Sequence, residues 1–409
     1  MAHTRCRLLV TTRIRGLLTT LNMQSAGLSN LTESEGLDLI AKRVSDEERT
    51  VTVAELPEEC KALISLVEGH TLAVSLIAAR LTKHEGGLDY APRLLSRLEK
   101  GKYFRTLQLN ETDKNHNLEL SLRLSYDDLG EDLQRRFRAL GVLASDGTFD
   151  EALAMALWGD EDADDTDDAL TDLVRKGLLR REDKNRYGQH GLLRAYALAL
   201  LTEADERDDT FVRYADYVTA VARQFLILPP QEWSQLDDDI PFIQHVGDQL
   251  AEAFDTREEW QDLALRFAVN TKNYVFRRPE IHRLTWLEMG LAISKAQADQ
   301  SREALFAGEL GLYHDNRGEK QQALVYYQTC LRLRSLTDDK YNEATTLNNI
   351  GGVYSALGDK ESALSYYEQA LPIYREVGDR GGEARTLNNI GAVYRSLGNM
   401  KEALSYFEH

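Results

Sequence analysis

The sequence predicts a mainly α-helical protein that ends in an α-solenoid, a stack of helix pairs. The carboxyl third repeats itself every 40 residues without gaps, and apolar residues recur at helical spacing through most of the remaining chain. Only 7 of the 409 residues are proline, so few positions interrupt helices. One short apolar run, residues 5–13, predicts a strand left from an α/β sheet at the amino end.

Composition excludes several classes of protein. Apolar residues make up 43% of the chain, enough to bury substantial cores, and the net charge of −18 disfavours non-specific binding to nucleic acid. The three cysteines, Cys6, Cys60 and Cys330, are few and far apart, which is typical of a reducing compartment. Without a signal peptide or a long apolar run, these features are typical of a cytoplasmic protein that does not enter membranes.

We expect five segments along the chain. They are an α/β remnant (1–30), a helical subdomain (31–112), a winged-helix segment (113–201), a helical connector (202–279) and the repeats (280–409).

The helical subdomain has clear local signals. Thr32 and Glu35 have the spacing of a capping box, which predicts a helix start. Leu63, Leu66 and Val67 lie on one face of an amphipathic helix, and a Gly-His-Thr-Leu-Ala segment at 69–73 follows it.

The third segment predicts helices followed by a hairpin. We expect a helix from Ala169 to Gly177, then a two-stranded hairpin that turns at Lys184-Asn185, and a final helix opening near His190. The acidic run at 159–168 lacks the glycine and the glutamate of a calcium-binding loop, so we interpret it as a solvated acidic loop. In the connector, aromatic residues at helical spacing predict core positions, and Pro229-Pro230 marks a break.

The repeat units open at Glu303, Glu343 and Glu383, and about 17 of 27 positions match between the second and the third. Glycines at helix crossings allow backbones to approach, and Gly318, Gly358 and Gly398 are expected at positive φ in the turns. The residues at 377–382 predict longer turns between units. A degenerate unit containing Trp286, Leu291 and Ile293 is expected before the three clear ones.

In pattern and spacing the repeats resemble the tetratricopeptide family, with Leu347, Gly351, Tyr354, Gly358 and Ala363 at its signature positions. The resemblance implies a groove lined by the first helices that binds a protein or peptide. The groove positions are Thr345, Asn348, Asn349, Ser355, Asn388 and Asn389. Asn amides can donate to and accept from a peptide backbone, and hydrogen bonding between helices of the solenoid is the alternative role.

Residues 5–201 resemble, in the order of their motifs, the carboxyl half of an NB-ARC module, the nucleotide switch of STAND-type signalling ATPases. The resemblance implies that Arg13, which follows Thr12 in the strand-end motif, senses the γ-phosphate, that Thr71 and Leu72 lie at the adenine, and that His190 reaches the β-phosphate of ADP. Thr71 stands where the family has proline, and His190 is flanked by Gln189 and Gly191 instead of methionine and aspartate. A surface arginine and a structural helix cap are the alternative roles of Arg13 and His190.

No GxxxxGK[ST] loop and no apolar strand ending in paired aspartates occurs in the sequence. The chain is therefore expected not to hydrolyse ATP, and ADP or ATP with Mg²⁺ is implied only for a complete parent protein. The last repeat breaks off within its second helix. We therefore expect an internal fragment or a split gene product. No zinc-binding motif is present, so no metal site is predicted, and without GxSxG no serine nucleophile is predicted either.

These features predict a regulatory signalling protein with an ADP/ATP-dependent STAND switch and repeats that bind a protein or peptide ligand, with self-association implied on activation. Two alternatives stay open. One is a transcriptional regulator whose winged helix binds DNA through Arg175, Lys176, Arg180 and Arg181. The other is a plain repeat adaptor whose switch has decayed.

Overall fold

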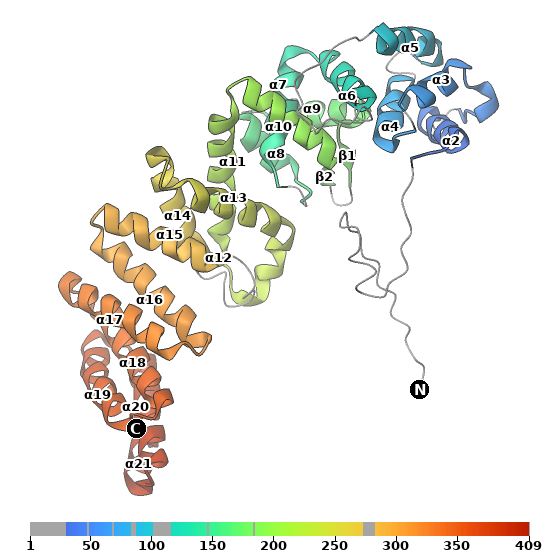
Figure 1. The fold of residues 1–409 in the computed structure, drawn as a ribbon. Helices are drawn as coiled ribbons and strands as arrows, with labels where there is room; N and C mark the ends of the chain where they lie inside the picture. The colour runs from blue at the N-terminus through green and yellow to red at the C-terminus, as the bar shows by residue number, and fades with distance from the viewer. Residues whose placement is uncertain are drawn as a thin grey trace, which may run out of the picture. The chain divides into compact units, whose positions relative to one another are not determined.

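The protein is described from a computed structural model, which covers residues 30–408 apart from 47–48, 68, 83–86, 101–115, 145–146, 183–184 and 273–282. The described chain is mainly α-helical, as predicted (Figure 1). It divides into two compact units: residues 30–134 with 172–178, and residues 135–171 with 179–408. The predicted strand at 5–13 lies outside the described residues.

The first unit is a bundle of short helices around one apolar core. Its elements are α2 (Glu33–Val44), η1 (Val53–Glu55), α3 (Glu59–Leu66), α4 (Thr71–Arg80), η2 (Leu88–Tyr90), α5 (Ala91–Lys100) and α6 (His116–Asp127). The capping box at Thr32 and Glu35 is confirmed, since each side chain bonds to the other residue's backbone N–H. Ile40, Leu63 and Ile77 are almost wholly buried in the shared core.

Two helices have residues in both units: α7 (Glu131–Ala139) and α9 (Ala163–Arg175). The prediction that α9 begins at Ala169, after an acidic loop, is wrong. The helix begins six residues earlier and takes up most of the acidic run, with Asp164 and Asp165 in its first turn. Carboxylates are favourable there because the amino end of a helix carries partial positive charge.

The second unit opens with η4 (Leu140–Val142), α8 (Glu151–Trp158) and the hairpin of β1 (Arg180–Arg181) with β2 (Tyr187–Gly188). The strands are antiparallel with Arg180 opposite Gly188, and Phe149 forms a further bridge to Tyr187. The predicted hairpin is thus present, while the winged-helix assignment stays a prediction. Arg136 and Asp160 form a buried ion pair, and the Thr166 hydroxyl also donates to Asp160 at 2.8 Å.

The part of the second unit between the hairpin and the repeats is a run of α-helices and 3₁₀-helices. They are α10 (Gly191–Glu203), α11 (Arg207–Ala222), α12 (Gln224–Ile227), η6 (Pro230–Asp239), α13 (Ile240–Ala253), η7 (Glu258–Trp260), α14 (Gln261–Thr271) and α15 (Arg283–Ala296). Trp286 and Ile293 of α15 are buried, at the positions expected for a degenerate unit. The aromatic residues predicted to form a core do so, with Tyr214 and Phe242 fully buried.

Three helix pairs complete the chain: α16 (Gln300–Asn316) with α17 (Lys320–Thr337), α18 (Lys340–Leu357) with α19 (Lys360–Val377), and α20 (Arg380–Ser396) with α21 (Met400–Phe407). These helices follow one another in orange and red in Figure 1. A Cβ on Gly351 would lie 2.7 Å from the Tyr367 ring, and one on Gly391 would lie 2.7 Å from Phe407. The predicted close approach at the crossing glycines is therefore confirmed.

The predicted longer turns between units are not observed. Only Gly378 and Asp379 separate α19 from α20, and the turn within the second pair, Gly358-Asp359, is equally short. The additional residues of the 40-residue period lie in the helices instead, since α19 extends to Val377 and α20 already begins at Arg380.

No helix in the described part of the chain is long and apolar enough to cross a membrane.

Candidate ligand-binding face of the repeat array

Each junction between the carboxyl-terminal helices ends in the same kind of residue pair, with two or three residues in the turn. A residue at positive φ is followed by the residue that caps the next helix, and both recur every 20 residues. The residues at positive φ are Ala298, Gly318, Asp338, Gly358, Gly378 and Gly398, and the caps are Asp299, Glu319, Asp339, Asp359, Asp379 and Asn399.

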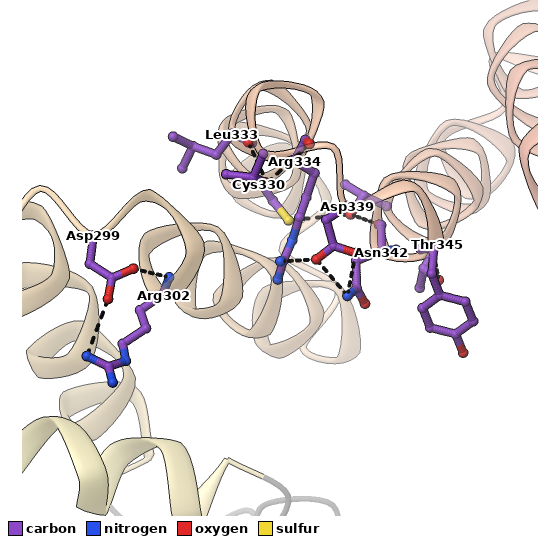
Figure 2. Close-up of polar contacts among 11 residues, drawn as sticks. Asp299, Arg302, Cys330, Leu333, Arg334, Asp339, Asn342 and Thr345 are labelled. Atoms are coloured by element: carbon purple, nitrogen blue, oxygen red, sulfur yellow. Dashed lines mark hydrogen bonds and ion pairs between the residues drawn. The ribbon is translucent and has the colours of Figure 1, made fainter. Parts of the chain in front are cut away.

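The aspartate caps make the same hydrogen bond. The Asp299 carboxylate accepts from the Arg302 backbone N–H at 3.0 Å, and Asp339 accepts from that of Asn342 at 3.3 Å (Figure 2). Such bonds satisfy N–H groups that the helix itself leaves unpaired. Asp359 and Asp379 make the same bond at 3.0 Å, whereas Glu319 and Asn399, in the turns within the first and third pairs, make no side-chain cap bond.

Stacked rings join the two helices of each pair. Tyr354 of α18 stacks on Tyr366 of α19 with centroids 5.5 Å apart, and Tyr394 of α20 stacks on Tyr406 in the same way. In the first pair His314 replaces the first tyrosine and stacks on Tyr326 at 5.3 Å. These contacts fix the first helix of each pair against the second.

The predicted groove residues differ in how much of each side chain a ligand could reach. Asn388 of α20 is exposed, and Thr345 and Asn349 of α18 are half-buried. The Thr345 hydroxyl donates to the Tyr341 carbonyl at 3.0 Å and accepts from the Tyr374 hydroxyl at 3.2 Å. Ser355 is half-buried and accepts from the Lys360 ammonium group.

Asn348 has a different environment. It is buried, and its amide oxygen accepts from the Thr386 hydroxyl at 3.2 Å and from the Asn389 amide at 3.1 Å. These bonds link α18 to α20 and match the alternative role considered for these residues, hydrogen bonding within the solenoid. Asn389 is half-buried and takes part in the same link.

A cluster that the sequence did not reveal lies at the junction of α17 and α18. Arg334 is buried and paired with the Asp339 cap, which also accepts from the Asn342 amide at 3.0 Å (Figure 2). One repeat later Tyr374 takes the place of Arg334, and Gly382 takes that of Asn342. A Cβ on Gly382 would lie 2.4 Å from the Tyr374 ring. The two repeats thus fill the same space with different side chains. A comparison of the repeats for shared residues therefore does not detect this cluster.

Three of the residues predicted to meet a nucleotide, Thr71, Leu72 and His190, are described, and they lie at helix starts. Thr71 is the exposed first residue of α4, and Leu72 beside it is buried. Gly69 has φ of 67° and its carbonyl accepts from the Leu31 N–H at 2.8 Å, which orients the start of α4. His70 next to it is partly buried, and burial lowers the pKa of its imidazole. Thr12 and Arg13 lie outside the described residues.

His190 caps α10. Its Nδ1 accepts from the Leu192 backbone N–H at 3.2 Å, which is the structural role considered as its alternative. A neutral imidazole that accepts at Nδ1 carries its proton on Nε2. The cap therefore fixes a tautomer with an N–H donor at the other end of the ring.

Other candidate chemistry is sparse in the described residues. No group of three or more His, Cys, Asp or Glu side chains there is placed to hold a metal ion. Cys60 and Cys330 are buried free thiols, and burial raises the pKa of Cys60 to about 11. A thiol of this kind is unreactive near neutral pH.

Comparison with known families decides the nature of the carboxyl-terminal segment. Residues 302–376 and 384–409 each match a tetratricopeptide repeat family. The carboxyl-terminal segment is a tetratricopeptide repeat array. Tetratricopeptide arrays present extended surfaces that bind other proteins, and the exposed polar side chains of α18 and α20 suit that role.

A curated relative, apoptotic protease-activating factor 1 of Danio rerio, is 27% identical over 185 residues, which are 44% of this chain. The match spans only 14% of that relative's length.

Two solved structures show lower likeness. A STAND protein with a tetratricopeptide repeat sensor from Pyrococcus horikoshii is 17% identical, covering 97% of this chain and 62% of that one, with a TM-score of 0.37. Aspartyl phosphate phosphatase F from Bacillus subtilis is 8% identical, covering 94% and 95%, with a TM-score of 0.35. Likeness at this level does not establish the fold of the whole chain.

Proposed function

We propose that this chain is the regulatory and ligand-sensing part of a STAND-type signalling protein. In this proposal the tetratricopeptide array binds a protein or peptide ligand, and the segment before it contributes to an ADP/ATP-dependent switch. The partial match to apoptotic protease-activating factor 1 and the order of motifs in residues 5–201 support the signalling assignment.

The observation that carries the ligand-binding role is the polar surface of the first helices. Asn388 is exposed, and the Thr345 and Asn349 side chains are half-buried on α18. Amide and hydroxyl groups both donate and accept, so they can pair with the backbone of an extended peptide whatever its side chains. Asn348 and Asn389 would support this surface by holding α18 against α20.

Photo-crosslinking tests this assignment. A photoreactive amino acid is placed at Asn388 on α20 or, as the control, at Gln369, an exposed amide on α19. The probe is a peptide selected from a random display library for binding to the intact chain. We expect crosslinks from position 388 and few from position 369. Equal crosslinking at the two positions would contradict binding at the first-helix surface.

The nucleotide arm of the proposal rests on His190. In a parent protein that supplies a phosphate-binding loop, the Nε2–H of His190 would donate to a phosphate oxygen of ADP while Nδ1 caps α10. His190→Ser keeps a capping oxygen but is too short to reach the phosphate. Calorimetry should show weaker ADP binding for this variant in the parent protein with unchanged thermal stability. Unchanged ADP affinity would remove His190 from the nucleotide site.

No observation favours the DNA-binding alternative. Arg175 pairs with Asp172 at 3.0 Å, Arg180 lies 3.5 Å from Glu182, and Arg181 donates to the Asn185 amide oxygen. These partners reduce the positive charge that each residue would offer to a phosphate backbone.

A further inference from the structure

A partly open pocket with charged walls, which the sequence did not predict, lies where the repeat array meets the helices before it. Its volume is about 540 Å³, and its walls come from α11, α14 and the start of α16. The charged and polar lining residues are Asp216, Thr219, Arg223, Asp262, Arg266 and Arg302. Leu265 and Val269 provide an apolar wall. A pocket of this size accommodates a side chain together with the adjoining peptide backbone.

The arginines offer many hydrogen-bond donors and are only partly used. Arg266 donates to Asp216 at 2.7 Å, and Arg302 lies 3.3 Å from the cap Asp299 (Figure 2). Each of these contacts uses a small part of a guanidinium group that carries five N–H donors. Arg223 is exposed, and the described part of the chain shows no partner for it. The pocket therefore has donors available for an anionic oxygen group.

Two acceptor groups in the pocket are also unused. The Asp262 carboxylate is exposed and has no partner within the described residues. Thr219 is 2% exposed, and its hydroxyl is buried without a hydrogen bond in the described structure, although most buried polar atoms have one. The neighbouring Asn270 amide bonds to the Thr219 carbonyl at 2.9 Å and so does not satisfy this hydroxyl.

These charges favour one class of ligand. With Arg266 and Arg302 paired, Arg223 and Asp262 are left as one unpaired cation and one unpaired anion. A carboxylate side chain can pair with Arg223 while the backbone N–H groups beside it donate to Asp262. Asp262 repels both anions, but a ligand carboxylate carries a single charge and brings N–H groups that donate to Asp262, whereas a phosphate dianion carries two charges and has no N–H group.

We propose that this pocket binds an aspartate or glutamate side chain of the peptide ligand, with the carboxylate on Arg223 and the adjoining backbone N–H on Asp262. The inference rests on the proposed peptide-binding function and extends its site. α14 and α15 form the helix pair before α16 and α17, so α14, α16, α18 and α20 are the first helices of successive pairs. The pocket thus belongs to the same series of helices as Asn349 and Asn388.

The pocket can be tested without knowing the ligand. The probes are N-acetyl-glutamate N-methylamide, its neutral glutamine counterpart and inorganic phosphate, each titrated into the full chain at constant ionic strength. Methyl NMR signals of Leu265 and Val269 report binding in the pocket. We expect saturable shifts with the glutamate compound and at least fivefold weaker binding of the glutamine compound.

Three variants sharpen the test. Arg223→Ala should weaken binding of the glutamate compound by about tenfold, since a charged hydrogen-bonded pair is lost. Arg332→Ala removes an equally exposed arginine from α17 and should leave binding unchanged. Asn388→Ala should also leave it unchanged, although it weakens binding of a selected peptide to the array.

Several results would overturn the proposal. Equal binding of the glutamate and glutamine compounds, or no effect of Arg223→Ala, would show that the pocket does not select for a carboxylate. Tighter binding of phosphate would reassign it to phosphate. If selected peptides bind the array but the glutamate compound leaves Leu265 and Val269 unaffected, the pocket proposal alone fails. If the glutamate compound binds but no peptide can be selected that binds the chain, the proposed function is contradicted, and with it the assignment of the pocket to a peptide ligand.

Discussion

At the scale of single residues, the array depends on where side chains are absent. Gly351 and Gly352 are neighbours in α18, yet only the first faces the Tyr367 ring closely. A Cβ at Gly351 would lie 2.7 Å from that ring, whereas the nearest atom to one at Gly352 is the Tyr367 hydroxyl at 3.7 Å. Close packing therefore requires glycine at position 351 but not at position 352, and the stabilities of variants at the two positions should differ.

Gly351→Ala should destabilise the protein by about 1–2 kcal/mol, because overpacking outweighs the gain in helix propensity. Gly352→Ala is the matched control and should be neutral or stabilising by up to about 1 kcal/mol. Urea unfolding of both variants checks the prediction. If the two variants have the same stability, the close helix crossing at Gly351 is not real.

His245 makes stability depend on pH. Burial lowers the pKa of its imidazole, and its Nε2 lies 3.1 Å from the Val142 carbonyl, which it donates to when neutral. The bond to the Val142 carbonyl raises this pKa, as do Asp248 and Glu252, while Arg194 lowers it, and burial has the largest effect. Below the unfolded pKa of 6.5, the unfolded chain binds a proton that the folded chain resists, so stability falls as pH drops.

His245→Gln retains an N–H donor but does not titrate. The decrease in free energy of unfolding between pH 7 and pH 5 should therefore be smaller in this variant than in the wild type. Denaturant unfolding at several pH values provides the comparison. Parallel pH profiles for the two proteins would show that His245 does not contribute.

At the scale of elements, the unit of regularity is shorter than the sequence repeat. Helices begin every 20 residues from Gln300 onward, each after one residue at positive φ and one cap. The sequence predicted the turns at Gly318, Gly358 and Gly398 but not those at Ala298 and Asp338, which adopt φ of 54° and 55° without glycine. The residue types at these two positions do not predict positive φ, because the flanking helices impose that backbone conformation on them.

Ala298→Gly should stabilise the protein by about 0.5–1 kcal/mol, since an L-residue at positive φ is strained and glycine is not. Gly378→Ala is the reciprocal change at φ of 74° and should cost about 1 kcal/mol. Chemical denaturation of the two variants measures both effects. A loss of stability in Ala298→Gly would contradict the shared turn geometry.

At the scale of the whole molecule, the sequence predicted features that depend on short-range patterns and missed those that depend on distant segments coming together. The array, its crossing glycines and the capping box at Thr32 follow from short-range patterns, so they could be predicted. The pocket around Arg223 could not, because its walls come from helices up to 86 positions apart, from Asp216 to Arg302. The helical spacing of Asp216, Thr219 and Arg223 predicts only that these three side chains lie on one helix face, which forms one wall of the pocket.

The chain alone should not turn over ATP. We base this proposal on the sequence, in which no GxxxxGK[ST] occurs; in P-loop enzymes that motif supplies the backbone cradle and the lysine that hold the transferred phosphate. Phosphate release from ATP and Mg²⁺ should stay at the buffer background, with a known ATPase assayed in parallel. Sustained turnover by the purified chain would mean that another site performs the chemistry.

The most direct test of the account is the affinity of a selected peptide for the array. Calorimetry should give a dissociation constant that rises by roughly tenfold in the Asn349→Ala/Asn388→Ala double variant, since two neutral hydrogen bonds are lost. Gln369→Ala, which removes an exposed amide from α19, should bind like the wild type. If the double variant binds as tightly as the wild type, the first helices of the array do not form the ligand-binding surface.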